Sequence, residues 1–273
     1  PSVGYQPDKF APGAKRCEID ESFPCDDWID QCRRWKEQYP IIKQEYYGGK
    51  YVNQYVFIEE LSKVLTGEDV IVVSSSGQAS DVFYPTFRAK EGQRIISSPG
   101  LGAMGFGLPS AIGASLASGR RVICIEGDGS IQLNMQELET IRRLNLNIKI
   151  FVLNNGGYAT IRNASKRHFE GRDHTAGMTV PPVFWLQKGD ILYSVGNTSG
   201  TPVSPLAMMY QIACYRINSS GGLKETIDSI LDDSKDKPMV CEVNSDPDLE
   251  LSPRLKSKIV DGKITPGRLE DVE

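Results

Sequence analysis

The sequence has few histidines, no closely spaced cysteine pair and no long apolar run, and each absence excludes a class of protein. Only His168 and His174 occur in 273 residues, so a histidine-based zinc site has little support. The six cysteines form no C-x-x-C pair, and Cys124 and Cys214 lie in apolar runs. These features indicate buried free thiols in a reducing compartment, which predicts a cytoplasmic location. No apolar stretch reaches the length of a membrane span, and no signal peptide is visible.

Charge and length narrow the classes further. The net charge of -4 argues against a nucleic acid or an acidic membrane surface as the main partner. The sequence has no G-x-x-x-x-G-K-[ST] motif, which counts against a generic magnesium–nucleotide domain of the P-loop type. It begins without Met, and the stretch 1–20 reads as the middle of a longer chain, so we expect residues upstream. The length favours one large domain, or one domain and a fragment.

Strand and helix patterns alternate along the chain. Apolar runs predict strands at 70–73, 94–97, 122–125, 148–153, 213–217 and 239–243. Helical periodicity predicts helices at 26–38, 53–65, 79–87, 105–117, 132–144, 159–168 and 223–231. This alternation with short turns predicts an α/β fold, a parallel sheet with helices on both faces. Ligands of such sheets bind at the carboxyl ends of the strands.

Two turns at strand ends carry the polar residues of interest. Asp128 lies between Gly127 and Gly129, directly after the strand at 122–125, and the glycines let the backbone pass close to a ligand. We expect Ser130 to cap the helix that starts near Gln132. Asn155, followed by two glycines, has the same place after the next strand. Both turns are therefore expected at one edge of the sheet.

Oxygen ligands of low charge suit a hard cation. Mg²⁺ takes one or two protein carboxylates and completes its shell with phosphate and water. A lone Asp128 at ~4 Å from a phosphate would be repelled by roughly 4 kcal/mol at a surface-like dielectric, and a divalent cation between them reverses the sign. Either motif alone is a common turn. Their pairing after successive strands predicts a site for magnesium and a phosphate group.

The motifs also carry a resemblance. "GDGS" followed by "NN" resembles the cofactor motif of thiamine diphosphate enzymes. "SPGLGAMGFGLPSAIGASLA" (98–117), "DPDLELSPRLKSKIVDGKI" (246–264) and "GYQPDKFAPGAKRCEID" (4–20) resemble segments of the acetolactate synthase group. The resemblance implies that residues 1–24 are the tail of a middle domain and 25–273 the diphosphate- and magnesium-binding domain with a C-terminal arm. The pyrimidine-binding domain is expected outside this chain.

The resemblance assigns roles residue by residue. It implies that Mg²⁺ is bound by the side chains of Asp128 and Asn155 and by the Gly157 carbonyl. It implies that the diphosphate of the cofactor lies against Gly77, Gln78, Gly127, Gly129 and Ser130. Met104 would be the apolar wedge that bends thiamine diphosphate, and the Gly102 carbonyl would accept from its 4′-amino group. No catalytic residue is expected in this chain, because the activating glutamate belongs to the pyrimidine-binding domain, usually of another subunit, so we expect a homodimer or tetramer.

The function implied is thiamine diphosphate- and magnesium-dependent decarboxylation and carboligation of a small 2-oxo acid. The sequence departs from the synthases at Ala79, where they usually have His, at Ala164, where they have Trp, and at 181–201, which has no counterpart. The stretch 181–201 is either a substrate lid or a surface insertion.

Two further functions stay open. The small Ala164 and the basic run 161–172, with Arg162, Lys166, Arg167 and Arg172, favour a related carboligase or decarboxylase of carbohydrate or nucleotide-sugar metabolism. That run is either a solvated basic face or a recognition site for an anionic substrate. A non-catalytic thiamine diphosphate-binding module is the other alternative.

Overall fold

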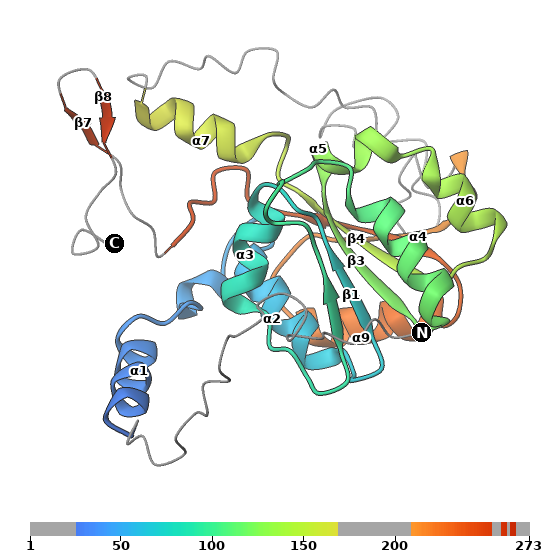
Figure 1. Cartoon of the computed structure of the whole chain (residues 1–273), viewed down its shortest axis with the longest axis horizontal. Coiled ribbons are helices and arrows are strands. Elements are labelled where there is room, and N and C mark those ends of the chain that lie inside the picture. The colour runs from blue at the N-terminus through green and yellow to red at the C-terminus, as the bar shows by residue number, and fades with distance from the viewer. Residues whose placement is uncertain (1–25, 169–208, 253–257, 261–262, 266–273) are drawn as a thin grey trace, which may run out of the picture. The chain divides into compact units, whose positions relative to one another are not determined.

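The computed structural model describes residues 26–168, 209–252, 258–260 and 263–265 (Figure 1). Contacts divide the chain into two compact units, residues 1–40 and 41–273. The first unit contains helix α1 (Asp26–Gln38), on which the rings of Trp28 and Trp35 meet edge to face, 5.4 Å apart. The expected tail at 1–24 and the stretch 181–201 lie outside the described residues, and the domain boundary after residue 24 stays a prediction.

The second unit is built on a six-stranded sheet in the order β2-β1-β3-β4-β6-β5. Every pair of neighbours in it is parallel, which confirms the predicted α/β fold. The strands agree with the expected ones and differ from them only at their carboxyl ends. They are β1 (Val70–Val73), β2 (Arg94–Ile96), β3 (Val122–Gly127), β4 (Ile148–Asn154), β5 (Ala213–Ile217) and β6 (Met239–Asn244).

Helices cover both faces of this sheet (Figure 1). Ile71 and Val73 of β1 pack in a core with α2 (Gln54–Val64), α3 (Gln78–Thr86) and α9 (Leu223–Ser234). Their neighbours Val70 and Val72 pack in a second core with α4 (Gly107–Ser118) and α6 (Glu137–Arg143). Because successive residues of a strand point to opposite faces, a strand buried on both sides reads as a continuous apolar run.

The remaining elements are short or lie near the sheet edge. They are η2 (Gln44–Tyr47), α5 (Asp128–Ile131), η3 (Gln132–Asn134), α7 (Ala159–His168), and an antiparallel hairpin of β7 (Lys258–Val260) and β8 (Lys263–Thr265) that the sequence did not predict. Cys124, Cys214 and Cys241 are buried free thiols, as expected. In the described ranges, no helix is long and apolar enough to cross a membrane.

A buried lysine closes the end of helix α9. Lys149 of β4 is fully buried, and its Nζ donates to the carbonyls of Ser234 at 3.3 Å, of Lys237 at 2.6 Å and of Lys235. Ser234 is the last residue of α9, and the other two carbonyls belong to the turn that follows it, so the ammonium holds together the turn that ends the helix. Burial, together with the nearby Arg121, lowers the pKa of Lys149 to about 8, so the group is still charged at neutral pH.

We expect Lys149→Met to lower the free energy of unfolding by about 1–3 kcal/mol, because it leaves carbonyls without a donor. Urea denaturation followed by circular dichroism measures the change. The exposed Lys237 is the matched control, and Lys237→Met should stay within about 0.5 kcal/mol. Equal stabilities for the two variants would show that the ammonium does not hold the end of α9.

Candidate functional site

Three strand exits meet at one edge of the sheet. Ser74 follows β1, Asp128 follows β3 and Asn155 follows β4, and these three strands are neighbours. The Ser74 N–H donates to the Ile125 carbonyl at 2.7 Å, so the first exit continues the strand ladder. The Gly157 N–H donates to Asp128 Oδ2 at 2.7 Å, which joins the second exit to the third. The structure thus brings Asp128 and Asn155 to one edge, as the strand pattern predicted.

Asp128 is a buried carboxylate held by backbone N–H groups. Its Oδ1 accepts from Gly129 at 2.9 Å and its Oδ2 from Gly157. Burial raises the pKa of Asp128 to about 7, although the N–H groups of Gly157 and Gly129 and the charge of Arg162 favour its ionised form. An oxygen site with this desolvation is one that a cation would stabilise.

The helical start was predicted incorrectly. Helical structure begins at Asp128 and not at Gln132, and it runs through α5, η3 and α6 as short consecutive turns. The N-cap is Gly127, with no side-chain cap, and Ser130 lies inside α5. The extended Gly127 lets the chain turn into a helix directly after β3, so the first N–H groups of α5 lie beside Asp128.

Ser130 instead anchors the loop before α4. Its Oγ accepts from the Gly105 N–H at 2.9 Å and lies 3.2 Å from the Ser74 hydroxyl. The Asn134 side chain donates to the Gly105 carbonyl at 2.7 Å, so the loop is held against α5 and η3. This loop carries Gly102, at a φ of +58°, and the half-buried Met104. Both expected cofactor contacts therefore lie on a loop fixed to the same edge.

Asn155 has one end of its amide engaged and the other free. Its Nδ2 donates to Gln78 Oε1 at 2.8 Å. Its Oδ1 is buried and has no hydrogen-bond partner in the described part of the chain. Gln78, expected at the diphosphate, gives its own Nε2 to the Leu249 carbonyl at 2.8 Å. The buried Asn155 oxygen is therefore available to a ligand.

The structure also shows the backbone conformation of two glycines expected at the site. Gly77 precedes α3 with a φ of +69°, and a Cβ built there would meet nothing within 4 Å, so its backbone faces open space. Gly157 has a φ of +117°, a conformation that favours glycine. Its carbonyl accepts from Ala159 N–H at 2.8 Å and keeps a second lone pair.

The donors at this edge fit a divalent cation. A buried polar atom without a partner costs about 1–3 kcal/mol, and a cation beside the Asn155 oxygen and the Asp128 carboxylate would offset that cost. Among the described residues, no group of three or more His, Cys, Asp or Glu could hold a metal ion. A cation at this edge would therefore need amide, backbone or ligand oxygens as well, which is the donor set of Mg²⁺.

The basic side chains of α7 are used within the fold. The Arg162 guanidinium donates to the carbonyls of Pro247 at 2.7 Å, of Asn155 at 3.0 Å and of Gly156 at 3.3 Å. Lys166 forms an ion pair with Asp248 at 2.7 Å. These contacts favour a structural role for both residues over recognition of an anionic substrate. The side chain of Arg167 and the whole of Arg172 lie outside the described part.

Two buried acids at the site were not found from the sequence. Glu126, at the carboxyl end of β3, is fully buried, and burial raises the pKa of its carboxyl to about 7, although the Ser130 and Ser74 hydroxyls oppose the shift. Its Oε2 accepts from the Gly127 N–H at 3.2 Å. A Cβ built on Gly107 would lie only 2.0 Å from its Oε1, so the carboxyl occupies the space beside that glycine. In the sequence, the position of Glu126 directly after the apolar run 122–125 was the feature that could have indicated a buried acid.

The second acid orients the other asparagine of the pair. Glu242 of β6 accepts from Asn154 Nδ2 at 2.7 Å and pairs with Arg216 of β5. Asn154 Oδ1 accepts in turn from the Gly156 N–H at 3.1 Å. This chain of contacts fixes the turn that presents Asn155.

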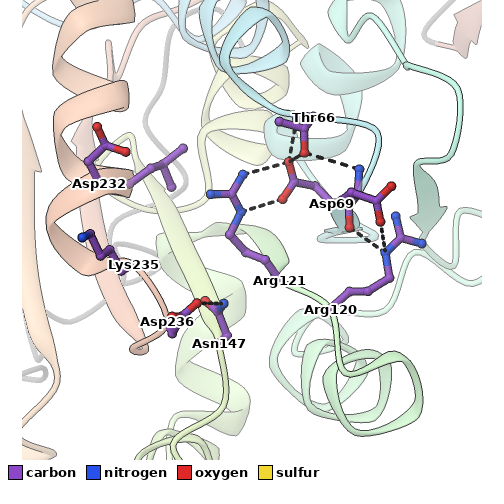
Figure 2. Close-up of a pocket in the computed structure, with 10 residues that line it drawn as sticks. Thr66, Asp69, Arg120, Arg121, Asn147, Asp232, Lys235 and Asp236 are labelled. Atoms are coloured by element: carbon purple, nitrogen blue, oxygen red, sulfur yellow. Dashed lines mark hydrogen bonds and ion pairs between the residues drawn. The ribbon is translucent and has the colours of Figure 1, made fainter.

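A charged cavity lies at the opposite, amino ends of the strands. Its volume is about 360 Å³, and Figure 2 shows the side chains that line it. Arg121 binds both carboxylate oxygens of Asp69, at 2.6 and 2.9 Å, and Arg120 donates to the carbonyl of Glu68 (Figure 2). Arg120 also donates to the carbonyl of Gly67 at 2.7 Å. Because these charges are already satisfied within the fold, the cavity is a weaker candidate site than the carboxyl edge.

A parallel α/β sheet with an acid, an amide and glycine turns at its carboxyl edge has the oxygen ligands and free backbone that suit a cation together with a phosphate group. Residues 75–243 match the family described as "Thiamine pyrophosphate enzyme, C-terminal TPP binding domain". The chain belongs to this family of thiamine pyrophosphate (thiamine diphosphate) enzymes.

Curated relatives and a solved structure agree with that assignment. The chain is 30% identical over 205 residues to the acetolactate synthase large subunit of Cyanidium caldarium, covering 75% of this chain and 31% of the relative. It is 36% identical over 166 residues to that of Buchnera aphidicola, covering 58% and 28%. The thiamine diphosphate-dependent 4-hydroxybenzoylformate decarboxylase of Rhodococcus jostii RHA1 is similar in structure, with a TM-score of 0.56 and 26% identity, over 73% of this chain and 33% of that one. The chain thus spans less than a third of the length of these curated relatives.

The contact between Gly107 and Glu126 generates a prediction. Gly107→Ala should lower the free energy of unfolding by about 1–3 kcal/mol, because the new methyl group displaces a buried carboxyl. Gly113 of the same helix is exposed, and a Cβ there would meet nothing within 4 Å. Gly113→Ala should therefore stabilise the fold by about 0.5–1 kcal/mol. Chemical denaturation of both variants measures the difference, and effects of the same sign would contradict the packing described.

Proposed function

We propose that this chain binds thiamine diphosphate through Mg²⁺ at the carboxyl edge of its sheet, and that it serves an enzyme that decarboxylates and ligates a 2-oxo acid in the manner of acetolactate synthases. One observation carries the proposal. Within the residues that match the TPP binding domain, a buried carboxylate and a buried amide oxygen with no described partner lie at neighbouring strand exits.

Each residue has a part in holding the cofactor. Asp128 and Asn155 bind Mg²⁺ through side-chain oxygens, and Gly157 binds it through the free lone pair of its carbonyl. The cation offsets the repulsion between the Asp128 carboxylate and the diphosphate. The backbone at Gly77, Gly127 and Gly129 and the hydroxyl of Ser130 lie beside the diphosphate, and the Gly129 N–H and the Ser130 oxygen keep their contacts with Asp128 and Gly105. These assignments are supported by the burial of Asp128 and by the open space at Gly77.

The loop before α4 holds the other part of the cofactor. The Gly102 carbonyl accepts from the 4′-amino group, and Met104 supports the bent conformation. Thiamine diphosphate, when bound, supplies the nucleophilic carbon and the electron sink that decarboxylation of a 2-oxo acid requires. The loop's role is to keep the cofactor in one conformation, and its attachment to Ser130 and Asn134 supports that role.

A second candidate function rests on Ala164. Ala164 is small and half-buried on α7, the helix that follows the turn of Asn155 and Gly157. A methyl group in place of a large aromatic side chain supports an acceptor larger than pyruvate or 2-oxobutyrate, as in a carboligase of carbohydrate or nucleotide-sugar metabolism. Arg162 and Lys166 are engaged with the backbone and with Asp248, so only the small size of Ala164 supports that acceptor.

We expect Asp128→Ala to abolish the magnesium-dependent binding of thiamine diphosphate, because it removes the charged side chain among the proposed protein ligands of the cation. Titration calorimetry with cofactor, in the presence of Mg²⁺ and of a chelator, measures the loss. Asp228→Ala, at an exposed position of α9, should bind as the unaltered chain does. Undiminished affinity in the Asp128 variant, with a native circular dichroism spectrum, would disprove the site.

We also propose that the activating glutamate comes from a pyrimidine-binding domain and that the active assembly is a homodimer or tetramer. A polypeptide of residues 1–273 alone should then bind cofactor without releasing carbon dioxide from pyruvate. An assay of carbon dioxide release from pyruvate, with added thiamine diphosphate and Mg²⁺, tests this. Turnover by the pure polypeptide would mean that the required carboxylate lies within these residues.

A further inference from the structure

Gln78 lies at the centre of a chain of three buried amides. Gln78 is 4% exposed, and Gln54, from the start of α2, is 0% exposed. Gln78 Oε1 accepts from Asn155 Nδ2 at 2.8 Å and from Gln54 Nε2 at 3.2 Å. Its Nε2 donates to the backbone carbonyl of Leu249 at 2.8 Å. Both ends of the Gln78 amide are therefore occupied by protein groups.

The direction of every hydrogen bond in this chain follows from the Leu249 carbonyl. A backbone carbonyl can only accept, so the NH₂ end of Gln78 must face it. The oxygen of Gln78 then faces Asn155, and an oxygen there accepts only from the NH₂ end of the Asn155 amide. The Asn155 oxygen is left on the other side, where it is buried and has no partner among the described residues.

We propose that Gln78 is a positioning residue, which fixes the side-chain oxygen of Asn155 toward the cation and links that orientation to the backbone of Leu249. The inference rests on the function proposed above, and it gives Gln78 a different role from the diphosphate contact that the family resemblance implied. An asparagine side chain is nearly symmetric in shape, so packing alone does not separate its oxygen from its nitrogen. Gln78 makes that choice, because the reversed amide would place two oxygens against each other.

The surroundings of Leu249 support a fixed end point for the chain. The Asn163 side chain of α7 also donates to the Leu249 carbonyl, at 3.0 Å, and Arg162 donates to Pro247. Leu249 itself is 8% exposed and packs in the core. Partners of metal ligands typically change metal affinity by about 10–100-fold when they are removed.

The experiment measures Mg²⁺ affinity by calorimetry at saturating thiamine diphosphate, in two backgrounds. Gln78→Met should weaken Mg²⁺ binding by about 10–100-fold in the unaltered chain. A carboxylate presents an oxygen in either orientation, so in the Asn155→Asp background the same change should have an effect of less than about threefold. Gln136→Met, the same change at an exposed position, should leave the affinity unaltered.

A second measurement needs neither metal nor cofactor. In the cofactor-free chain, the NMR signals of the Asn155 side-chain NH₂ should exchange with solvent more slowly than those of exposed asparagines, and Gln78→Met should remove that protection. Equal losses of Mg²⁺ affinity in both backgrounds, as a direct diphosphate contact would give, or an unprotected Asn155 amide would overturn the proposal. A protected amide in a chain that binds no cofactor would overturn the proposed function and leave the positioning role standing.

Discussion

The parallel alignment of β1, β3, β4 and β6 determines where every residue of the site lies. Parallel strands end on one side of a sheet, so the polar turns that follow them must gather there. The register pairs Gly127 with Leu153 and Asn154 with Asn244, which places the exits of three neighbouring strands level with each other. Helices on both faces keep water from the strands, so the turns are the first point at which the backbone leaves the two cores. A binding site at this edge is therefore a consequence of topology, with residue identity deciding only what it binds.

A buried carboxylate at this edge costs free energy, and the fold stabilises Glu242 and Asp128 in different ways. Glu242 has a cationic partner in Arg216 and an amide donor in Asn154. Asp128 has backbone N–H groups and a more distant Arg162, and the pKa of its carboxyl stays raised by burial. In the described part of the chain Asp128 forms no salt bridge that would lower this pKa, so its carboxylate stays responsive to an incoming cation. The same groups that destabilise the empty fold supply the driving force for binding.

The sequence allowed the sheet and the main site residues to be predicted, and it failed where long-range contacts decide. Strands buried on both faces are continuous apolar runs, so β1, β3, β4 and β6 could be located closely, and the strand-end rule placed Asp128 with Asn155. The helix start at Gln132 was wrong, because a glycine in extended conformation allowed helix directly after β3. Gln78 contacts a backbone carbonyl 171 positions away. Every residue has a backbone carbonyl, so no residue type in the sequence indicates this contact. Arg162 and Lys166 resemble a ligand-binding pair in the sequence, but both contact the segment after β6, at Pro247 and Asp248.

The close approach of Gly107 to Glu126 also constrains how this sequence can change over time. The glutamate carboxyl fills the space that any side chain at position 107 would need, so the effects of changes at the two positions are coupled. A shorter acid at position 126 would empty that space, and alanine at position 107 could then fill it. The order of the two replacements matters, because one order passes through a cavity and the other through a clash. The pair therefore makes the order of the two replacements decide which intermediate the domain must tolerate.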